Sequence, residues 1–133
     1  NLLANFSKIS GVTIVEHWKP NVTHVIASTD GTGACKRTLR FLKAILDGKW
    51  VLKMDWIKAC TEAMDLVYEE PYEVGLDNRG CRDGPRNGRL RVSEGAPKLL
   101  SGLQFYFSDD FAPSYRESLE ELVIAAGALV LTL

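Results

Sequence analysis

The segment DGKWVLKMDWIKAC, residues 47–60, contains two tryptophans six residues apart and a cysteine four residues after the second. The apolar run 50–52 follows Gly48, which predicts the end of one helix and then a short buried strand. Asp55 is a residue type that caps helices and predicts the start of the next helix. The apolar positions of that helix are Trp56, Ile57, Cys60 and Met64. The two tryptophans thus belong to a strand and a helix, and we expect both to pack against a sheet instead of forming one stacking platform.

Upstream of this segment, predicted strands alternate with predicted helices. A helix is predicted over residues 2–10 and ends at Gly11, and strands are predicted at 12–15 and 22–27. A turn at residues 28–33 leads into a second helix, whose apolar stripe is formed by Cys35, Leu39, Leu42 and Leu46. Apolar strands joined to helices by short loops are typical of a parallel sheet with helices on its faces. The sequence therefore predicts an α/β fold.

The composition is that of a folded protein with no dominant charge. The 133 residues are 46% hydrophobic, enough for one domain or for two compact modules. The 16 basic residues nearly balance the 17 acidic ones, so no overall field favours nucleic acid or an acidic substrate as partner. No apolar run approaches the roughly 20 residues that span a bilayer, so no membrane partner is expected. The chain begins with Asn1 instead of Met, and we interpret it as a fragment of a longer protein.

The three cysteines are Cys35, Cys60 and Cys81, and they form no CxxC pair. An odd number of unpaired cysteines fits a reducing compartment better than a disulfide framework or a zinc cluster. We therefore expect the cytosol or the nucleus as the location, no metal site and no cofactor.

Residues 75–97 differ from the rest of the chain. They hold five of the eleven glycines and two of the five prolines, with almost no apolar periodicity, which predicts a linker. Beyond it, strands are predicted at 103–107 and 128–131. Between these strands lies a helix with an apolar stripe formed by Tyr115, Leu119, Leu122, Val123 and Ala126. A shift of 116 residues places Gly11 on Gly127 and lays one helix-Gly-strand unit on the other, which indicates a tandem repeat across the linker.

Several motifs resemble the tandem form of the BRCT domain family. They are VTHVI at 22–26, TLRFLKAILDGKWVLKMDWIKAC at 38–60, PYEV at 71–74, GPRNGRL at 84–90 and PKLLSGLQFYF at 97–107. Within the family, the chain looks most similar to the tandem modules of RING-domain proteins of the DNA-damage response. The resemblance implies a four-stranded parallel sheet flanked by helices in each module. The structural positions that it implies are Gly11, Trp50, Trp56, Cys60 and Gly127.

The resemblance also implies the domain order. The first BRCT module is expected at residues 1–74, the Gly/Arg-rich linker at 75–97 and the start of the second module at 98–133. The first strand of the first copy and the end of the second copy are expected to be incomplete. Strand 103–107 is one candidate to fill the place of that first strand, within the chain or by exchange between chains.

Tandem BRCT modules commonly bind a phosphoserine peptide, and the resemblance implies which residues do so here. Thr38 and Arg40 match the helix positions that hold the phosphate, and Arg37 matches a contact to the peptide main chain. Arg40 stands where the family usually has Lys. The positive charge is kept, but a planar guanidinium that can donate two parallel hydrogen bonds replaces an ammonium group. The family's Ser-Gly phosphate element would precede Asn1. Helical spacing places Arg37 and Arg40 on one face, and the alternative to a phosphate site is a solvated basic face.

A specificity pocket between the modules is implied at Leu42, Phe111, Pro113 and Ser114. Ser114 stands where a methionine lines this pocket in relatives, which argues against a preference for an aromatic residue three positions after the phosphoserine. Leu42 and Phe111 can equally be core residues at the interface between the modules. The linker arginines form a second candidate surface, for DNA phosphates or an acidic histone surface, and they are Arg79, Arg82, Arg86, Arg89 and Arg91.

We conclude from the sequence that the chain is a binding module of a nuclear DNA-damage or chromatin protein, and not an enzyme. The expected partner is a phosphorylated protein or peptide. The alternative is a reader of ubiquitylated nucleosomes or poly(ADP-ribose), in a parent chain that pairs with a RING partner protein through other regions as a ubiquitin ligase subunit. A nucleotide-dependent α/β enzyme is a remote alternative, because GTGACK at 31–36 lacks the spacing of a phosphate loop.

Overall fold

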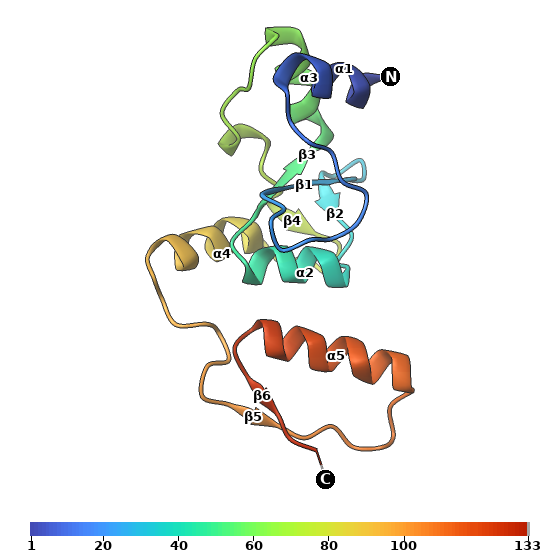
Figure 1. The fold of residues 1–133 in the computed structure, drawn as a ribbon, viewed down its shortest axis with the longest axis vertical. Coiled ribbons are helices and arrows are strands. Elements are labelled where there is room, and N and C mark those ends of the chain that lie inside the picture. The colour runs from blue at the N-terminus through green and yellow to red at the C-terminus, as the bar shows by residue number, and fades with distance from the viewer. Residues whose placement is uncertain (133) are drawn as a thin grey trace.

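The computed structural model describes residues 1–132 and contains five α-helices and three pairs of parallel strands among them (Figure 1). The helices are α1 Leu2–Ser10, α2 Leu39–Leu46, α3 Met54–Ala63, α4 Gly84–Ser93 and α5 Pro113–Ala125, with a short 3-10 helix η1 at Glu70–Tyr72. The strands are β1 His24–Ala27, β2 Ala34–Cys35, β3 Trp50–Lys53, β4 Leu76–Asp77, β5 Gln104–Phe105 and β6 Leu129–Val130. The prediction of a parallel α/β fold is confirmed.

The first module is built on the pair β1–β3. The strands run parallel, with Val25 opposite Val51 and Ile26 opposite Leu52. Because successive side chains of a strand point to opposite faces, Val51 and Leu52 begin two separate cores. The Leu52 core is covered by α1 and α3, and the Val51 core is covered by α2, as Figure 1 shows. Helices therefore cover both faces of the strand pair.

Residues 12–15 do not form the expected strand, and this prediction is wrong. Gly11 ends α1 in the left-handed conformation, with φ 74°, and the chain then continues without regular structure. A strand is stabilised by hydrogen bonds to a neighbouring strand, and none of the described strands pairs with this segment. Ile14 and Val15 remain 45% and 40% exposed.

The two tryptophans of the opening segment lie on β3 and α3. Trp56 is 4% exposed, packs edge-on against Phe6 with ring centroids 5.6 Å apart, and donates from Nε1 to the Val67 carbonyl at 3.0 Å. Cys60 is buried in the same core. The prediction that Asp55 caps this helix is wrong, because α3 follows β3 directly and places Asp55 inside its first turn.

The segment 75–97, which was predicted as a linker, contains regular structure, because β4 and α4 lie within it. Apolar periodicity did not reveal α4, since the helix is held by polar and close backbone contacts. Arg89 donates to both carboxylate oxygens of Glu73 at 2.6 and 2.8 Å and lies 3.7 Å from the ring centroid of Trp50. Gly88 approaches the Ile45 carbonyl so closely that a methyl group there would overlap it.

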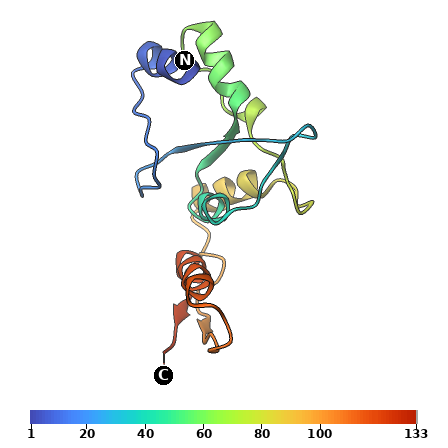
Figure 2. The same ribbon diagram turned by 90° about the vertical axis from the view of Figure 1, so that its right-hand side faces the viewer.

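The second module is represented by β5, α5 and β6. Gln104 pairs with Leu129 and Phe105 with Val130, so strand 103–107 does not fill a place in the first module's sheet within the chain. Gly127, with φ 99°, makes the turn between α5 and β6. Helix α2 contacts both α4 and α5, and Figures 1 and 2 show it between the two modules. No helix within residues 1–132 is long and apolar enough to cross a membrane.

Candidate functional site at the start of helix α2

Thr38 begins helix α2. Its backbone is extended, with φ −108° and ψ 170°, and its Oγ1 accepts a hydrogen bond from the Phe41 N–H at 3.2 Å. This is the N-cap arrangement, in which a side-chain oxygen satisfies one of the unpaired N–H groups of the first turn. The Thr38 side chain is exposed, so its hydroxyl hydrogen remains available as a donor to an incoming anion.

Arg40 lies one residue into α2 and is exposed. It forms no ion pair with any residue that the structure describes. A guanidinium without a carboxylate partner has its hydrogen-bond donors available for a ligand. The first turn of a helix also carries a partial positive charge from the aligned peptide dipoles. Thr38 and Arg40 each offer hydrogen-bond donors to an anion at the start of α2.

The inference that Arg37 shares a helix face with Arg40 is wrong. Arg37 precedes the N-cap, so it lies outside the helix. Its Nε and Nη2 donate to Oδ2 of Asp77 at 3.0 and 2.9 Å, and Nη2 also lies 2.7 Å from the Cys81 sulfur. The hydrogen bond to Asp77 raises the pKa of the Arg37 guanidinium above its already high value. Arg37 is thus held in place by the last residue of β4 and by Cys81 in the loop that follows.

Asp77 is the partner that sequence reasoning missed. Its side chain is 5% exposed, and Oδ1 accepts the backbone N–H groups of Arg79 at 2.8 Å and Cys81 at 3.1 Å. Burial by itself raises the pKa of this carboxyl, but the hydrogen bonds from Arg79, Cys81 and Arg37 outweigh it, and the net pKa is lowered. The signal available in the sequence was Asp77 three residues before Gly80, because an Asp side chain commonly bonds the backbone of such a turn.

The proposed pocket residues lie in different places. Leu42 is half-buried against the Val51 core, whereas the Phe111 ring packs on Phe107 and Tyr115 at centroid distances of 6.2 and 6.0 Å. Pro113 is the first residue of α5, and the Ser114 carbonyl accepts a hydrogen bond from Ser118 Oγ at 3.1 Å. Neither of the two cavities described here contains any of these four residues. The specificity pocket therefore stays a prediction.

The five linker arginines divide into two groups. Arg89 is occupied by Glu73 and Trp50, and Arg91 donates to the Pro97 carbonyl at 2.7 Å. Arg79, Arg82 and Arg86 are exposed and form no ion pair in the described chain. Helix α4 carries three of the five, Arg86, Arg89 and Arg91, whereas Arg79 and Arg82 lie in the loop before it.

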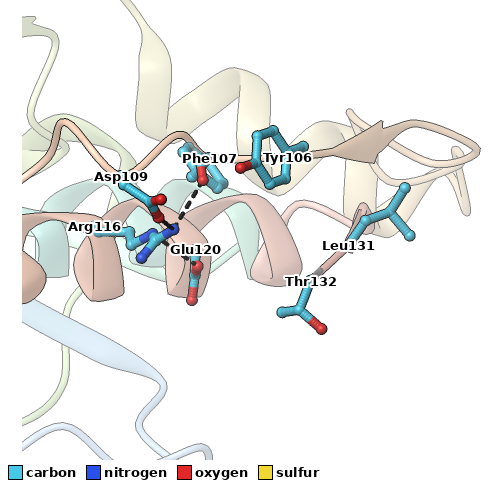
Figure 3. Close-up of a pocket in the computed structure, with 7 residues that line it drawn as sticks. All are labelled: Tyr106, Phe107, Asp109, Arg116, Glu120, Leu131 and Thr132. Carbon is cyan, nitrogen blue, oxygen red and sulfur yellow. Dashed lines mark hydrogen bonds and ion pairs between the residues drawn. The ribbon is translucent and has the colours of Figure 1, made fainter.

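The cavities lie away from the start of α2. A cavity of about 460 Å³ lies where α2, α4 and α5 meet, between Leu46, Val92 and Ala126. A second cavity, of about 310 Å³, lies beside α5 (Figure 3). There the Arg116 guanidinium donates to the Phe107 carbonyl at 2.9 Å and to Asp109 Oδ1 at 3.2 Å. Glu120 Oε1 lies 3.8 Å from Arg116 Nε, so two carboxylates neutralise this guanidinium and leave no anion site.

The cysteines and acidic side chains form no further site within residues 1–132. Cys35 and Cys60 are buried and Cys81 is exposed, and all three are free thiols. Burial, and the nearby charge of Asp77, raise the pKa of the Cys35 thiol. No group of three or more His, Cys, Asp or Glu side chains in this part of the chain is arranged to hold a metal ion.

Comparison with known proteins agrees with this architecture. Residues 2–61 match the family model of the BRCA1 C Terminus (BRCT) domain. The chain is 51% identical over 129 residues to the Protein BREAST CANCER SUSCEPTIBILITY 1 homolog of Arabidopsis thaliana, covering 97% of the chain and 14% of that protein. It is also 51% identical over 119 residues to the BRCA1-associated RING domain protein 1 of the same plant, covering 90% of the chain and 17% of that protein.

A solved structure extends the match to both modules. The BRCT5-BRCT6 domains of S. pombe Brc1 superpose with a TM-score of 0.70 at 28% sequence identity, covering 97% of this chain and 59% of that one. The chain spans only about one sixth of the two plant relatives, and it matches them over most of its own length. The sequence match, the parallel strand pairs and the likeness to a tandem pair lead to one conclusion. The chain belongs to the BRCT domain family, and it has the fold of a tandem BRCT region.

Proposed function

We propose that this tandem BRCT region binds a phosphoserine peptide at the start of α2, as part of a nuclear protein that acts in DNA repair. BRCT domains are protein-interaction modules, and relatives of this chain are RING-domain proteins. In this proposal Thr38 donates its hydroxyl hydrogen to one phosphate oxygen, and Arg40 donates two N–H groups to the others. Phosphorylation of the partner then adds the phosphate group that this site binds.

The single observation that carries the proposal is the exposed, unpaired guanidinium of Arg40 beside the Thr38 cap. A phosphoserine carries a charge of about −1.5 to −2 at pH 7 and three acceptor oxygens. Arg40 supplies a planar fork of donors, and the helix terminus adds a partial positive charge at the same place. The guanidinium of Arg116 shows the contrast, because its neighbouring carboxylates already balance its charge.

Arg37 has a supporting role in this proposal. Asp77 and Cys81 engage its Nε and Nη2, which leaves the N–H groups of Nη1 for a carbonyl of the peptide. The Asp77 carboxylate fixes the direction of the guanidinium before the peptide arrives. Such preorganisation lowers the entropic cost of binding, because the side chain does not have to be ordered again.

The test compares an oriented phosphoserine peptide library with the same library without phosphate. Fluorescence anisotropy with the selected peptide then gives the dissociation constant for each variant. Arg40→Gln should weaken binding by about 10- to 100-fold, because a hydrogen bond to a charged group contributes about 1.5–3 kcal/mol. Arg40→Lys should weaken it less, because the charge remains. Lys58→Gln, which removes an exposed charge on α3, is the matched control and should bind like the wild type.

Two results would contradict the proposal. One is equal affinity for the phosphorylated and the unphosphorylated library. The other is an Arg40→Gln variant that retains wild-type affinity while circular dichroism shows that it is folded. Either result would favour the second candidate function, a reader of nucleosomes or poly(ADP-ribose).

The second candidate is a reader of ubiquitylated nucleosomes or poly(ADP-ribose), in a parent protein that works with a RING partner as a ubiquitin ligase. The exposed arginines 79, 82 and 86 favour it, since unpaired guanidiniums suit DNA phosphates or an acidic histone surface. A salt titration of nucleosome binding separates it from the first candidate. Neutralising these three arginines should lower the slope of log affinity against log salt, and an unchanged slope would exclude their contact with nucleic acid.

A further inference from the structure

We propose that the loop after β4 forms a second recognition surface, which takes acidic residues that flank the phosphoserine. We name it the cationic surface and define it by Lys36, Arg79 and Arg82, which are exposed. Lys36 lies two residues before Thr38, and Arg79 and Arg82 lie in the loop after β4. This inference rests on the proposed function and specifies its substrate class, an acidic phosphopeptide.

Hydrogen bonds hold this loop against the segment that leads into α2. The Asn78 Oδ1 accepts the Arg37 N–H at 3.0 Å, and the Asn78 N–H donates to the Cys35 carbonyl at 2.8 Å. The parallel pair β2–β4 places Cys35 opposite Asp77. Figure 2 shows the loop, in yellow-green, beside the segment that enters α2. Arg79 follows Asn78 directly, so its backbone is fixed next to the start of the helix.

Asp77 gives the loop a defined shape. Its carboxylate accepts two backbone N–H groups of the loop, from Arg79 and Cys81, and the guanidinium of Arg37 on the other side. The Asp77 N–H in turn donates to the Cys81 carbonyl at 3.0 Å, which closes the turn. The same buried carboxylate therefore positions both Arg37 in the phosphate site and Arg79 in the cationic surface.

The charge of this region differs from that of the whole chain. The protein as a whole has a net charge of −1. The charges of Arg37 and Asp77 cancel in their ion pair. Lys36, Arg79 and Arg82 form no ion pair among residues 1–132, and Asp83 is the one acidic residue that follows them in the loop. A local excess of positive charge thus adjoins the phosphate site.

These observations favour an acidic peptide over a nucleic acid. Domains that bind nucleic acid mainly through charge have a pI above about 9, whereas this chain has a pI of about 6.1. Three free cations beside a single phosphate site match a short acidic run better than a continuous phosphate backbone. An extended peptide advances about 3.3–3.6 Å per residue. Four residues on one side of the phosphoserine therefore span about 13–14 Å when extended.

The test uses two synthetic phosphoserine peptides that differ only in their flanks. One has four alanines on each side of the phosphoserine, and the other has four aspartates on each side. Fluorescence anisotropy at 50 mM and 300 mM salt should show about threefold to tenfold tighter binding of the aspartate peptide at low salt, because exposed ion pairs contribute modestly. The gain should shrink at high salt, since screening shortens the range of exposed charges.

The double variant Arg79→Gln/Arg82→Gln should lose this gain and keep its affinity for the alanine peptide. The matched control is Lys8→Gln/Lys58→Gln, which removes two exposed charges from α1 and α3 and should keep the gain. Equal affinity of the wild type for the two phosphopeptides would overturn the cationic surface alone. A gain that survives Arg79→Gln/Arg82→Gln would also overturn it. Binding of neither peptide would overturn the proposed function as well, and so would equal binding of unphosphorylated versions of the two peptides.

A competition experiment distinguishes an acidic peptide from a nucleic acid as the ligand of the cationic surface. A 20-base-pair duplex is added as competitor against the labelled aspartate peptide. Displacement by unphosphorylated polyaspartate but not by duplex is expected for a peptide-binding surface. Stronger displacement by duplex than by polyaspartate, lost in Arg79→Gln/Arg82→Gln, would overturn the assignment to an acidic peptide.

Discussion

The two modules differ in how completely their elements are buried. In the first, Val51 and Leu52 on β3 are fully buried, with one core on each face of the strand pair. In the second, Ala126 and Ala128 are the buried apolar residues within the part that the structure describes, and Tyr115 and Leu129 remain 57% and 64% exposed. Helices thus cover both faces of the β1–β3 pair in the first module, whereas α5 is the helix that contacts the β5–β6 pair in the described part of the second.

The same contrast holds for charge. In the first module Arg37 is fixed by a buried carboxylate, and Arg40 beside it remains free for a ligand. In the second, Arg116 forms ion pairs with two carboxylates of its own module. A guanidinium therefore indicates an anion site only where the surrounding acidic groups are absent or are already paired with another cation.

The largest expected effect tests the difference in burial. Trp56→Ala should lower the free energy of unfolding by ~3–5 kcal/mol, because it removes a buried aromatic ring that contacts Phe6 and a hydrogen bond to Val67. Ile124→Ala on α5, where the side chain is half exposed, should change it by only ~0.5 kcal/mol. Urea denaturation followed by circular dichroism measures both. Equal losses would break the comparison between the modules.

An intermediate effect tests the packing of α4 on α2. Gly88→Ala improves helix propensity by roughly 1 kcal/mol, but its methyl group would overlap the Ile45 carbonyl. We expect the clash to dominate, with a net loss of ~1–3 kcal/mol in the free energy of unfolding. Gly31→Ala is the control, because no atom lies within 4 Å of the added carbon, and its midpoint in urea should stay unchanged. A more stable Gly88→Ala protein would show that α4 packs less closely.

The smallest effect concerns pH and the Asp77 carboxylate. Because its pKa is lowered in the folded protein, its stabilisation is present above the unfolded value of about 3.9 and is lost as the pH falls through the folded value. The urea midpoint of the wild type should exceed that of Asp77→Asn at pH 7. The two should approach each other below about pH 4. A constant difference down to pH 3 would mean that the carboxylate's charge contributes nothing to stability.

Much of the fold was predictable from the sequence, because a helix or strand with one buried face repeats its apolar residues at a regular spacing. The spacing around Trp56 predicted α3, and the apolar run at Trp50 predicted β3. Strand 12–15 was wrongly predicted because pairing depends on a partner distant in sequence. Helix α4 was missed because Glu73, Trp50 and Ile45 hold it, and none of these contacts leaves an apolar stripe. Pro85 in its first turn was the signal available.

The candidate site was predictable only in part. Thr38 and Arg40 are only two residues apart, and resemblance to the family was enough to single them out. The partner of Arg37 lies 40 residues later, so no local pattern links the two side chains. Arg79 was recognised as a basic residue, but its backbone is placed near the start of α2 by the hydrogen bonds of Asn78 and Asp77. Folding, not spacing, brings these groups together.

Helix α2 connects the ligand site with the contact between the modules. Its first turn carries Thr38 and Arg40, its Lys43 pairs with Glu121 on α5, and its Ile45 carbonyl meets α4. A ligand that binds more tightly when α2 is docked on α5 must also strengthen that docking, because thermodynamic coupling between two sites is reciprocal. Changes at the far end of this eight-residue helix then alter affinity without touching the ligand. If the proposed site binds its ligand in this way, the arrangement of the two modules contributes to its affinity.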